Sequence, residues 1–220
     1  MTRPLARGLE KNRIEALVDG VFAVALTLLV LDIRLPEGVV APTDAALAAQ
    51  LATLERHFVI YVVTFIVVGV YWINHHIQFH FIEHTNRSLI WINLGYLMVV
   101  SFLPFATDLV GDHEKLVLPC EIYGIALLIL TATSLSHIHY LARHPELTSA
   151  EFTPEIVTLL RRRSALFALV PTISMAVAFV STRAAIYAYV LLGALHFIPG
   201  RIDHRIARAE NAAQEATPQS

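Results

Sequence analysis

Residues 13–37 decide the fold and read RIEALVDGVFAVALTLLVLDIRLPE. Between Asp19 and Asp32, only Thr27 is neither apolar nor glycine. An α-helix crosses the roughly 30 Å hydrocarbon core of a bilayer in about 20 predominantly apolar residues. A charge at the bilayer centre costs about 2.5–3.5 kcal/mol, so the two aspartates are expected at the membrane interfaces or beside a polar partner. The stretch therefore predicts a membrane-spanning helix over residues 16–35.

The composition of the whole chain is also that of a membrane protein. Of its 220 residues, 56% are hydrophobic and 15% are charged, whereas soluble domains average about 45–50% and about 25%. The 16 basic and 18 acidic residues nearly cancel, which argues against a nucleic-acid partner. The single cysteine, Cys120, excludes an internal disulfide and a cysteine-rich metal cluster. We therefore expect an all-α membrane protein surrounded by lipid.

Six stretches are predicted to span the membrane, although the last two are short. They cover residues 16–35, 58–82, 89–110, 116–141, 165–180 and 184–198. Together they form one predicted transmembrane domain over residues 1–208, and the small polar residues 209–220 are expected to be disordered. A short surface helix is predicted between the first two spans, from about Pro42 to Arg56.

Basic residues beside these stretches predict the orientation. With six crossings, one side of the membrane holds twelve arginines and lysines and the other side holds four. Cytoplasmic loops of membrane proteins carry the excess of these residues. Both termini are therefore expected in the cytoplasm.

One stripe of the first helix has two interpretations. At about 100° per residue, a single face holds Leu17, Gly20, Val24, Thr27, Leu28, Leu31 and Leu35. The stripe is suited to packing against another helix. Alternatively, copies of it line a pore in an oligomer, where rings of apolar side chains block ions by dewetting and a threonine hydroxyl replaces lost hydration. Periodicity alone does not distinguish these interpretations.

The first helix contains a recognisable motif. Arg13 and Asp19 have the spacing of an Arg-x-x-x-Phe-Ser-Asp sequence, and residues 20–23 (GVFA) continue it, while Leu17 and Val18 stand in place of Phe and Ser. This segment resembles the first helix of the transmembrane protein 175-type potassium channels, in particular their short prokaryotic members.

Two later segments extend the resemblance. Residues 71–76 (YWINHH) are similar to the family's tryptophan and paired histidines on its second helix. Asn93 and residues 101–105 (SFLPF) resemble the corresponding part of its third helix. The likeness covers roughly residues 13–107, and the remaining spans agree mainly in topology.

The resemblance implies a potassium-preferring cation channel. It implies a homotetramer with six helices per subunit, in which the first helix of each subunit lines a central pore without a Thr-Val-Gly-Tyr-Gly filter. It places the hydrophobic constriction at Val24, Leu28 and Leu31, and a selectivity-tuning hydroxyl at Thr27. Monovalent cations are then the transported partners, potassium is the permeant ion, and no cofactor is needed. The resemblance to the short prokaryotic members also places the protein in the plasma (inner) membrane of a prokaryote.

The resemblance also implies a set of residues that support the pore helix rather than bind ions. They are Arg13, Asp19, Trp72, His75 and His76. No catalytic residue is predicted, and the protein is not expected to be an enzyme.

Two other functions stay open from the residues themselves. His76, His80 and His84 recur every four residues, so they are predicted to share one face of the second helix, where two of them could hold a metal. A membrane metal- or haem-binding redox protein that uses the second-helix histidines is therefore one alternative. A secondary transporter is the other, although no paired repeat or broken helix is evident.

Overall fold

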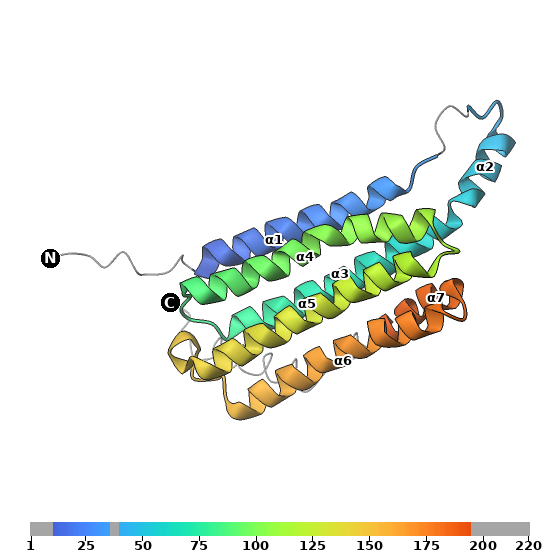
Figure 1. The fold of residues 1–220 in the computed structure, drawn as a ribbon. Coiled ribbons are helices and arrows are strands. Elements are labelled where there is room, and N and C mark those ends of the chain that lie inside the picture. Colours follow the sequence, from blue (N-terminus) through green and yellow to red (C-terminus); the bar gives the residue numbers. More distant parts are fainter. Residues whose placement is uncertain (1–10, 36–39, 195–220) are drawn as a thin grey trace, which may run out of the picture.

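The computed structural model describes residues 11–35 and 40–194, and every regular element within these residues is a helix (Figure 1). The elements are α1 (Lys11–Leu28), η1 (Leu29–Asp32, a 3-10 turn), α2 (Asp44–Thr53), α3 (Glu55–His80), α4 (Arg87–Asp112), α5 (Val117–Arg143), η2 (Pro145–Leu147), α6 (Pro154–Ala178) and α7 (Thr182–Ala194). One isolated antiparallel bridge joins Ile82 to Thr148 between them.

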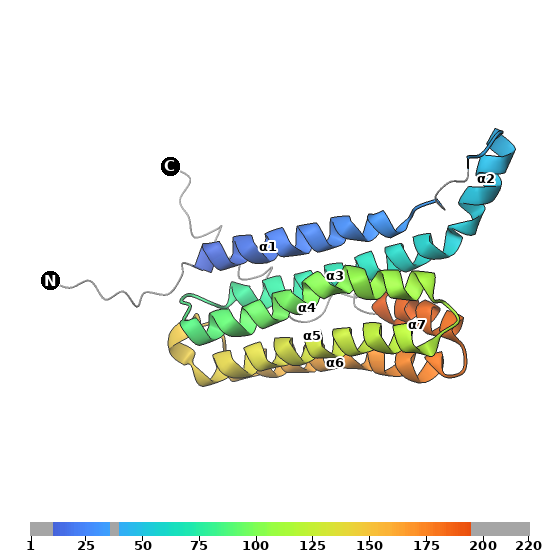
Figure 2. The same cartoon turned by 45° about the horizontal axis from the view of Figure 1, so that its top comes forward.

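The long helices lie lengthwise beside one another in a bundle. Helix α1 forms one edge of the bundle and α6 the opposite edge, with α3, α4 and α5 between them (Figures 1 and 2). Helix α2 projects beyond the end of the bundle, and none of its residues is buried. Because α1 lies at the edge, it has neighbours on one side only. The side chains on its other side are not covered by another described helix.

Side-chain caps explain where several helices begin. The Asn86 side chain accepts a hydrogen bond of 2.9 Å from Leu89 N at the start of α4. Thr153 caps α6 just before Pro154, which lacks an N–H and is pre-organised for the first helical position. Thr43 accepts from Ala46 N at 3.2 Å and starts α2, so the predicted short helix between the first two spans is confirmed.

Four of the described helices are long and apolar enough to cross a membrane. They are α1 with η1, α3, α4 and α5. Helix α6 begins at Pro154, well before the predicted span 165–180, and it carries Arg161, Arg162 and Arg163 in its second and third turns. The end of the predicted span 184–198 and the predicted tail 209–220 lie outside the described residues.

Candidate functional site

Helix α1 buries one side against α3 and α4 and leaves the other side open. Its buried residues are Ile14, Val18, Phe22 and Ala25, and Leu29 follows in η1. The predicted stripe lies on the opposite side. We call its six exposed residues the open face of α1: Leu17, Gly20, Val24, Thr27, Leu28 and Leu31. The stripe is therefore not a packing seam against the described helices of its own chain.

The three predicted constriction residues have exposed side chains. The exposed fraction is 56% for Val24, 42% for Leu28 and 64% for Leu31. Val24 and Leu28 are four residues apart on an α-helix, whereas Leu31 lies in the 3-10 turn that begins after Leu28. Residues three apart are eclipsed in a 3-10 helix. The change of helix type thus keeps Leu31 in line with Leu28 along the open face.

Thr27 lies on the same face with its hydroxyl directed at the backbone. Its Oγ1 donates to the carbonyl oxygens of Ala23 and Val24, both at 2.9 Å. A hydroxyl has one donor hydrogen and two acceptor lone pairs. Because the hydrogen is used within the helix, the lone pairs are what Thr27 can offer to a cation.

Asp19, Trp72 and His76 form one of the predicted support contacts between α1 and α3. Trp72 Nε1 donates to Asp19 Oδ1 at 2.9 Å. The Trp72 ring stacks on His76, with ring centroids 5.8 Å apart and planes 26° apart. Asp19 is therefore directed toward α3 by its partner, although its position on α1 is exposed.

The other two predicted support residues do not join this contact. Arg13 is exposed, and within the described residues no hydrogen bond or ion pair is recorded for it. His75 is buried instead, and its Nε2 is 2.8 Å from Asn93 Oδ1 on α4. The structure thus divides the predicted support set between two sites.

The sequence analysis missed a column of polar residues inside the bundle. Tyr71, Asn74 and Gln78 of α3 face Thr131, Ser134 and His137 of α5, and all six are buried. Ser134 Oγ accepts from Asn74 Nδ2 at 3.2 Å and from Gln78 Nε2 at 2.7 Å. We call these six residues the buried polar column.

Aromatic and histidine rings continue the column toward α4. His137 Nδ1 is 2.9 Å from Gln78 Oε1, and the rings of His75, Phe79 and His137 stack with centroids 4.4–6.0 Å apart. The signal for this column was present in the sequence, since Tyr71, Asn74 and Gln78 recur at helical spacing within an apolar span. Such polar residues inside a membrane bundle join helices by hydrogen bonds.

Acidic residues at the α2 end of the bundle are paired with bases. Asp108 lies 4.0 Å from Arg34 Nη2, Asp112 lies 3.5 Å from His57 Nε2, and Glu114 pairs with Arg56. Thr182 Oγ1 also donates to the Glu114 backbone carbonyl, which joins the loop before α5 to the start of α7. Pairing lowers the negative potential that these acids would otherwise present to cations.

The histidine spacing on the second span does not produce a metal site in the described part of the chain. Helix α3 ends at His80, so the prediction that His84 shares a helix face with His76 and His80 is wrong. The backbone N–H groups of Glu83 and His84 instead bond to Leu147 O. No group of three or more His, Cys, Asp or Glu side chains able to hold a metal occurs among the described residues.

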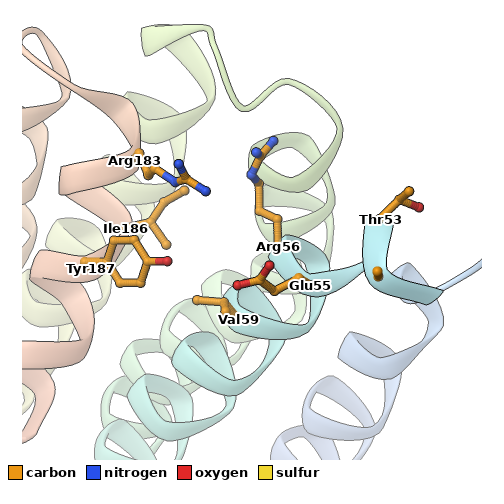
Figure 3. A pocket seen from close by; sticks show the side chains of 8 residues that line it. Thr53, Glu55, Arg56, Val59, Arg183, Ile186 and Tyr187 are labelled. Carbon is orange, nitrogen blue, oxygen red and sulfur yellow. The ribbon is translucent and has the colours of Figure 1, made fainter. Parts of the chain in front are cut away.

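A small pocket lies away from the open face, at the α2 end of the bundle (Figure 3). Residues of α2, α3 and α7 line it, and none comes from α1. Arg56 and Arg183 stand on opposite sides of it above Val59, Ile186 and Tyr187 (Figure 3).

The comparisons with known proteins agree with this geometry. Residues 13–104 match the family described as endosomal/lysosomal potassium channel TMEM175. A potassium channel of Chryseobacterium sp. is 37% identical over 119 residues, which are 54% of this chain and 58% of that protein. A potassium channel of Streptomyces collinus is 39% identical over 106 residues, 48% of this chain and 50% of that protein. The chain therefore spans about half the length of these curated relatives.

A solved structure agrees over a longer region. The crystal structure of a lysosomal potassium-selective channel TMEM175 homolog from Chamaesiphon minutus superposes with a TM-score of 0.71 at 24% identity, covering 84% of this chain and 95% of that chain. This likeness shows the fold, and with the four apolar helices it makes the chain a multi-pass membrane protein. The family match begins at Arg13 and contains every residue of the open face and of the predicted support set. The resemblance predicted from the sequence is confirmed, because residues 13–104 are similar to the TMEM175 channel family.

Proposed function

We propose that this chain is one subunit of a potassium-preferring cation channel. The observation that carries the proposal is the open face of α1, an apolar stripe on a helix of membrane-spanning length that no described helix of the same chain covers. Two relatives of the chain, from Chryseobacterium sp. and Streptomyces collinus, are potassium channels by name. The open faces of several copies brought together enclose a pore.

The proposed channel is a homotetramer, with six membrane helices per subunit and both termini in the cytoplasm of a prokaryotic cell. Four copies of α1 surround the pore, and Val24, Leu28 and Leu31 form its narrow apolar rings. Water leaves a narrow apolar ring readily, so such rings block ions until they widen. Dewetting of this kind explains how leucine and valine side chains can close a pore to ions.

The hydration of the two ions predicts that such a pore prefers potassium over sodium. Sodium holds its water shell more strongly than potassium, so a mostly apolar pore favours the ion that is cheaper to dehydrate. The Thr27 oxygens face the pore in this proposal and offer lone pairs, because their hydrogens are bonded to Ala23 O and Val24 O. Val24 is a small side chain for a constriction, which makes the degree of selectivity sensitive to this position.

Asp19, Trp72 and His76 hold α1 in place in this proposal, and His75 positions α3 against α4. They act on the pore through the orientation of α1 rather than by touching ions. Arg13, at the same end of α1, belongs to the proposed support set because of its place in the family motif. Conduction of this kind is passive and needs no cofactor.

The experiment is a reversal-potential measurement in liposomes that contain the purified full chain, with potassium on one side and sodium on the other. A reversal potential displaced toward the potassium equilibrium value is the expected result. Clear current that reverses near zero would indicate a nonselective pore, and the potassium preference would be wrong. An absence of current with correctly inserted protein would overturn the channel proposal and favour a transporter.

A further inference from the structure

Helices α4 and α5 lie side by side in both views of the bundle (Figures 1 and 2). Two hollows open along this pair of helices, and we call the two together the groove. Six of the exposed residues of α5 recur at intervals of three or four and therefore form one stripe. They are Ile125, Ile129, Ala132, Ser136, His139 and Arg143. Along this stripe the side chains change from apolar to small to basic.

The part of the groove nearer the middle of the bundle is apolar. Met98 and Phe102 of α4 face Ile125 and Ile129 of α5 around a hollow of about 650 Å³. Met98 is 71% exposed and Phe102 41% exposed. In a membrane, the acyl chains of lipids can occupy this hollow.

The other end of the groove is basic. A second hollow of about 490 Å³ is lined by Ser136, His139, Tyr140 and Arg143, with Ile92 and Leu135 on its apolar side. Arg161 Nη2 from α6 approaches His139 Nδ1 at 3.4 Å. Within the described residues no ion pair is recorded for Arg143 or Arg161, while Glu146 nearby bonds to His144.

The length of the groove fits one leaflet. Ile129 and His139 are ten residues apart on α5, which at 1.5 Å per residue is about 15 Å. Half of the roughly 30 Å hydrocarbon core has the same thickness. An acyl chain in the apolar hollow therefore places its phosphate beside His139 and Arg143.

We propose that this groove binds one anionic phospholipid per subunit, with an acyl chain against Met98 and Ile129 and the headgroup phosphate at Arg143 and His139. Arginine donates paired hydrogen bonds to phosphate oxygens, and basic pockets between membrane helices bind anionic headgroups. Among the described residues, no acidic side chain lines the hollow that holds His139 and Arg143, and this favours an anionic lipid over a zwitterionic one. The proposal requires only that the chain spans a membrane, so it does not depend on potassium conduction.

The test is native mass spectrometry of the purified full chain with phosphatidylglycerol or phosphatidylcholine of identical acyl chains. The wild type is expected to retain phosphatidylglycerol in preference to phosphatidylcholine. Arg143→Gln is expected to lower phosphatidylglycerol retention by about tenfold, the loss of about one charge-assisted hydrogen bond. Ile129→Trp fills the apolar hollow and is expected to lower retention of both lipids.

Matched variants on α6 provide the controls. Arg162 and Leu166 are exposed but line neither hollow, so Arg162→Gln and Leu166→Trp should leave retention unchanged. Equal losses in Arg143→Gln and Arg162→Gln would mean that the surface attracts anions without a site, and would overturn the proposal. A photo-crosslinking amino acid at Ile129 distinguishes the occupants, because a lipid adduct supports the site and a crosslink to a second copy of the chain overturns it.

Discussion

Trp72 Nε1 donates a hydrogen bond of 2.9 Å to Asp19 Oδ1 and thereby joins α3 to α1 at a defined point. The remaining described contacts of α1 are largely apolar, through residues such as Ile14, Val18 and Phe22. Burial of one side of α1 constrains its rotation, and the directional hydrogen bond adds a fixed point for its rotation and height. The direction of the open face therefore depends on a contact that lies outside it.

Trp72→Phe removes the donor and keeps an aromatic ring. We expect a loss of about 1 kcal/mol of stability, because the bond has a charged acceptor but is partly exposed, together with altered gating of potassium flux. Thermal unfolding in detergent and liposome flux measure the two effects. The chain has two tryptophans, and Trp91→Phe on the exposed side of α4 is the matched control. Equal effects of both variants would remove the Asp19 bond from the explanation.

Leu28→Ala shortens a side chain of the open face and should widen the proposed ring, raising flux severalfold and weakening the preference for potassium over sodium. Stability should change by less than about 0.5 kcal/mol, because Leu28 is exposed within the chain. Leu169→Ala makes the same change on an exposed position of α6 and should leave flux and ion preference unaltered. If Leu28→Ala behaves like Leu169→Ala, the open face does not line the pore.

Thr27→Val replaces the hydroxyl by a methyl group of nearly the same shape. We expect a smaller potassium-to-sodium permeability ratio with normal folding, whereas Thr27→Ser, which keeps the hydroxyl, should retain the ratio. Thr172 of α6 is also exposed and also donates to its own helix, at 2.7 Å from Ala168 O, so Thr172→Val is the control. Reversal potentials under mixed-cation conditions measure the ratio, and an unchanged ratio in Thr27→Val would exclude this hydroxyl from selectivity.

Ser134→Ala removes the oxygen that accepts from both Asn74 and Gln78 in the buried polar column. Two buried amide groups then lose a partner, which should cost about 1–3 kcal/mol of stability. Ser136, two residues along α5, is exposed and donates to its own helix at Ala132 O, so Ser136→Ala should change stability by less than about 0.5 kcal/mol. The thermal unfolding midpoints of the two variants in detergent provide the comparison. Equal midpoints would mean that the column contributes nothing to joining α3 and α5.

The sequence by itself determined the membrane class, the helical fold and the stripe on the first helix. These follow from local quantities, because apolar length decides whether a helix can cross a bilayer and a period near 3.6 decides which residues share a face. The motif around Arg13 and Asp19, and Trp72 with His75 and His76, were found in the sequence through the resemblance to the channel family.

Only the tertiary structure decided which stripe of α1 stays open and where the support residues face. Tyr71, Trp72, His75 and His76 are neighbours in sequence, yet helical rotation directs Trp72 and His76 toward α1, His75 toward Asn93 and Tyr71 toward Thr131. The structure also placed the end of α3 at His80, which removed His84 from the histidine stripe. Local periodicity defines faces relative to one another, but burial of one of them depends on neighbours that lie far away in the sequence.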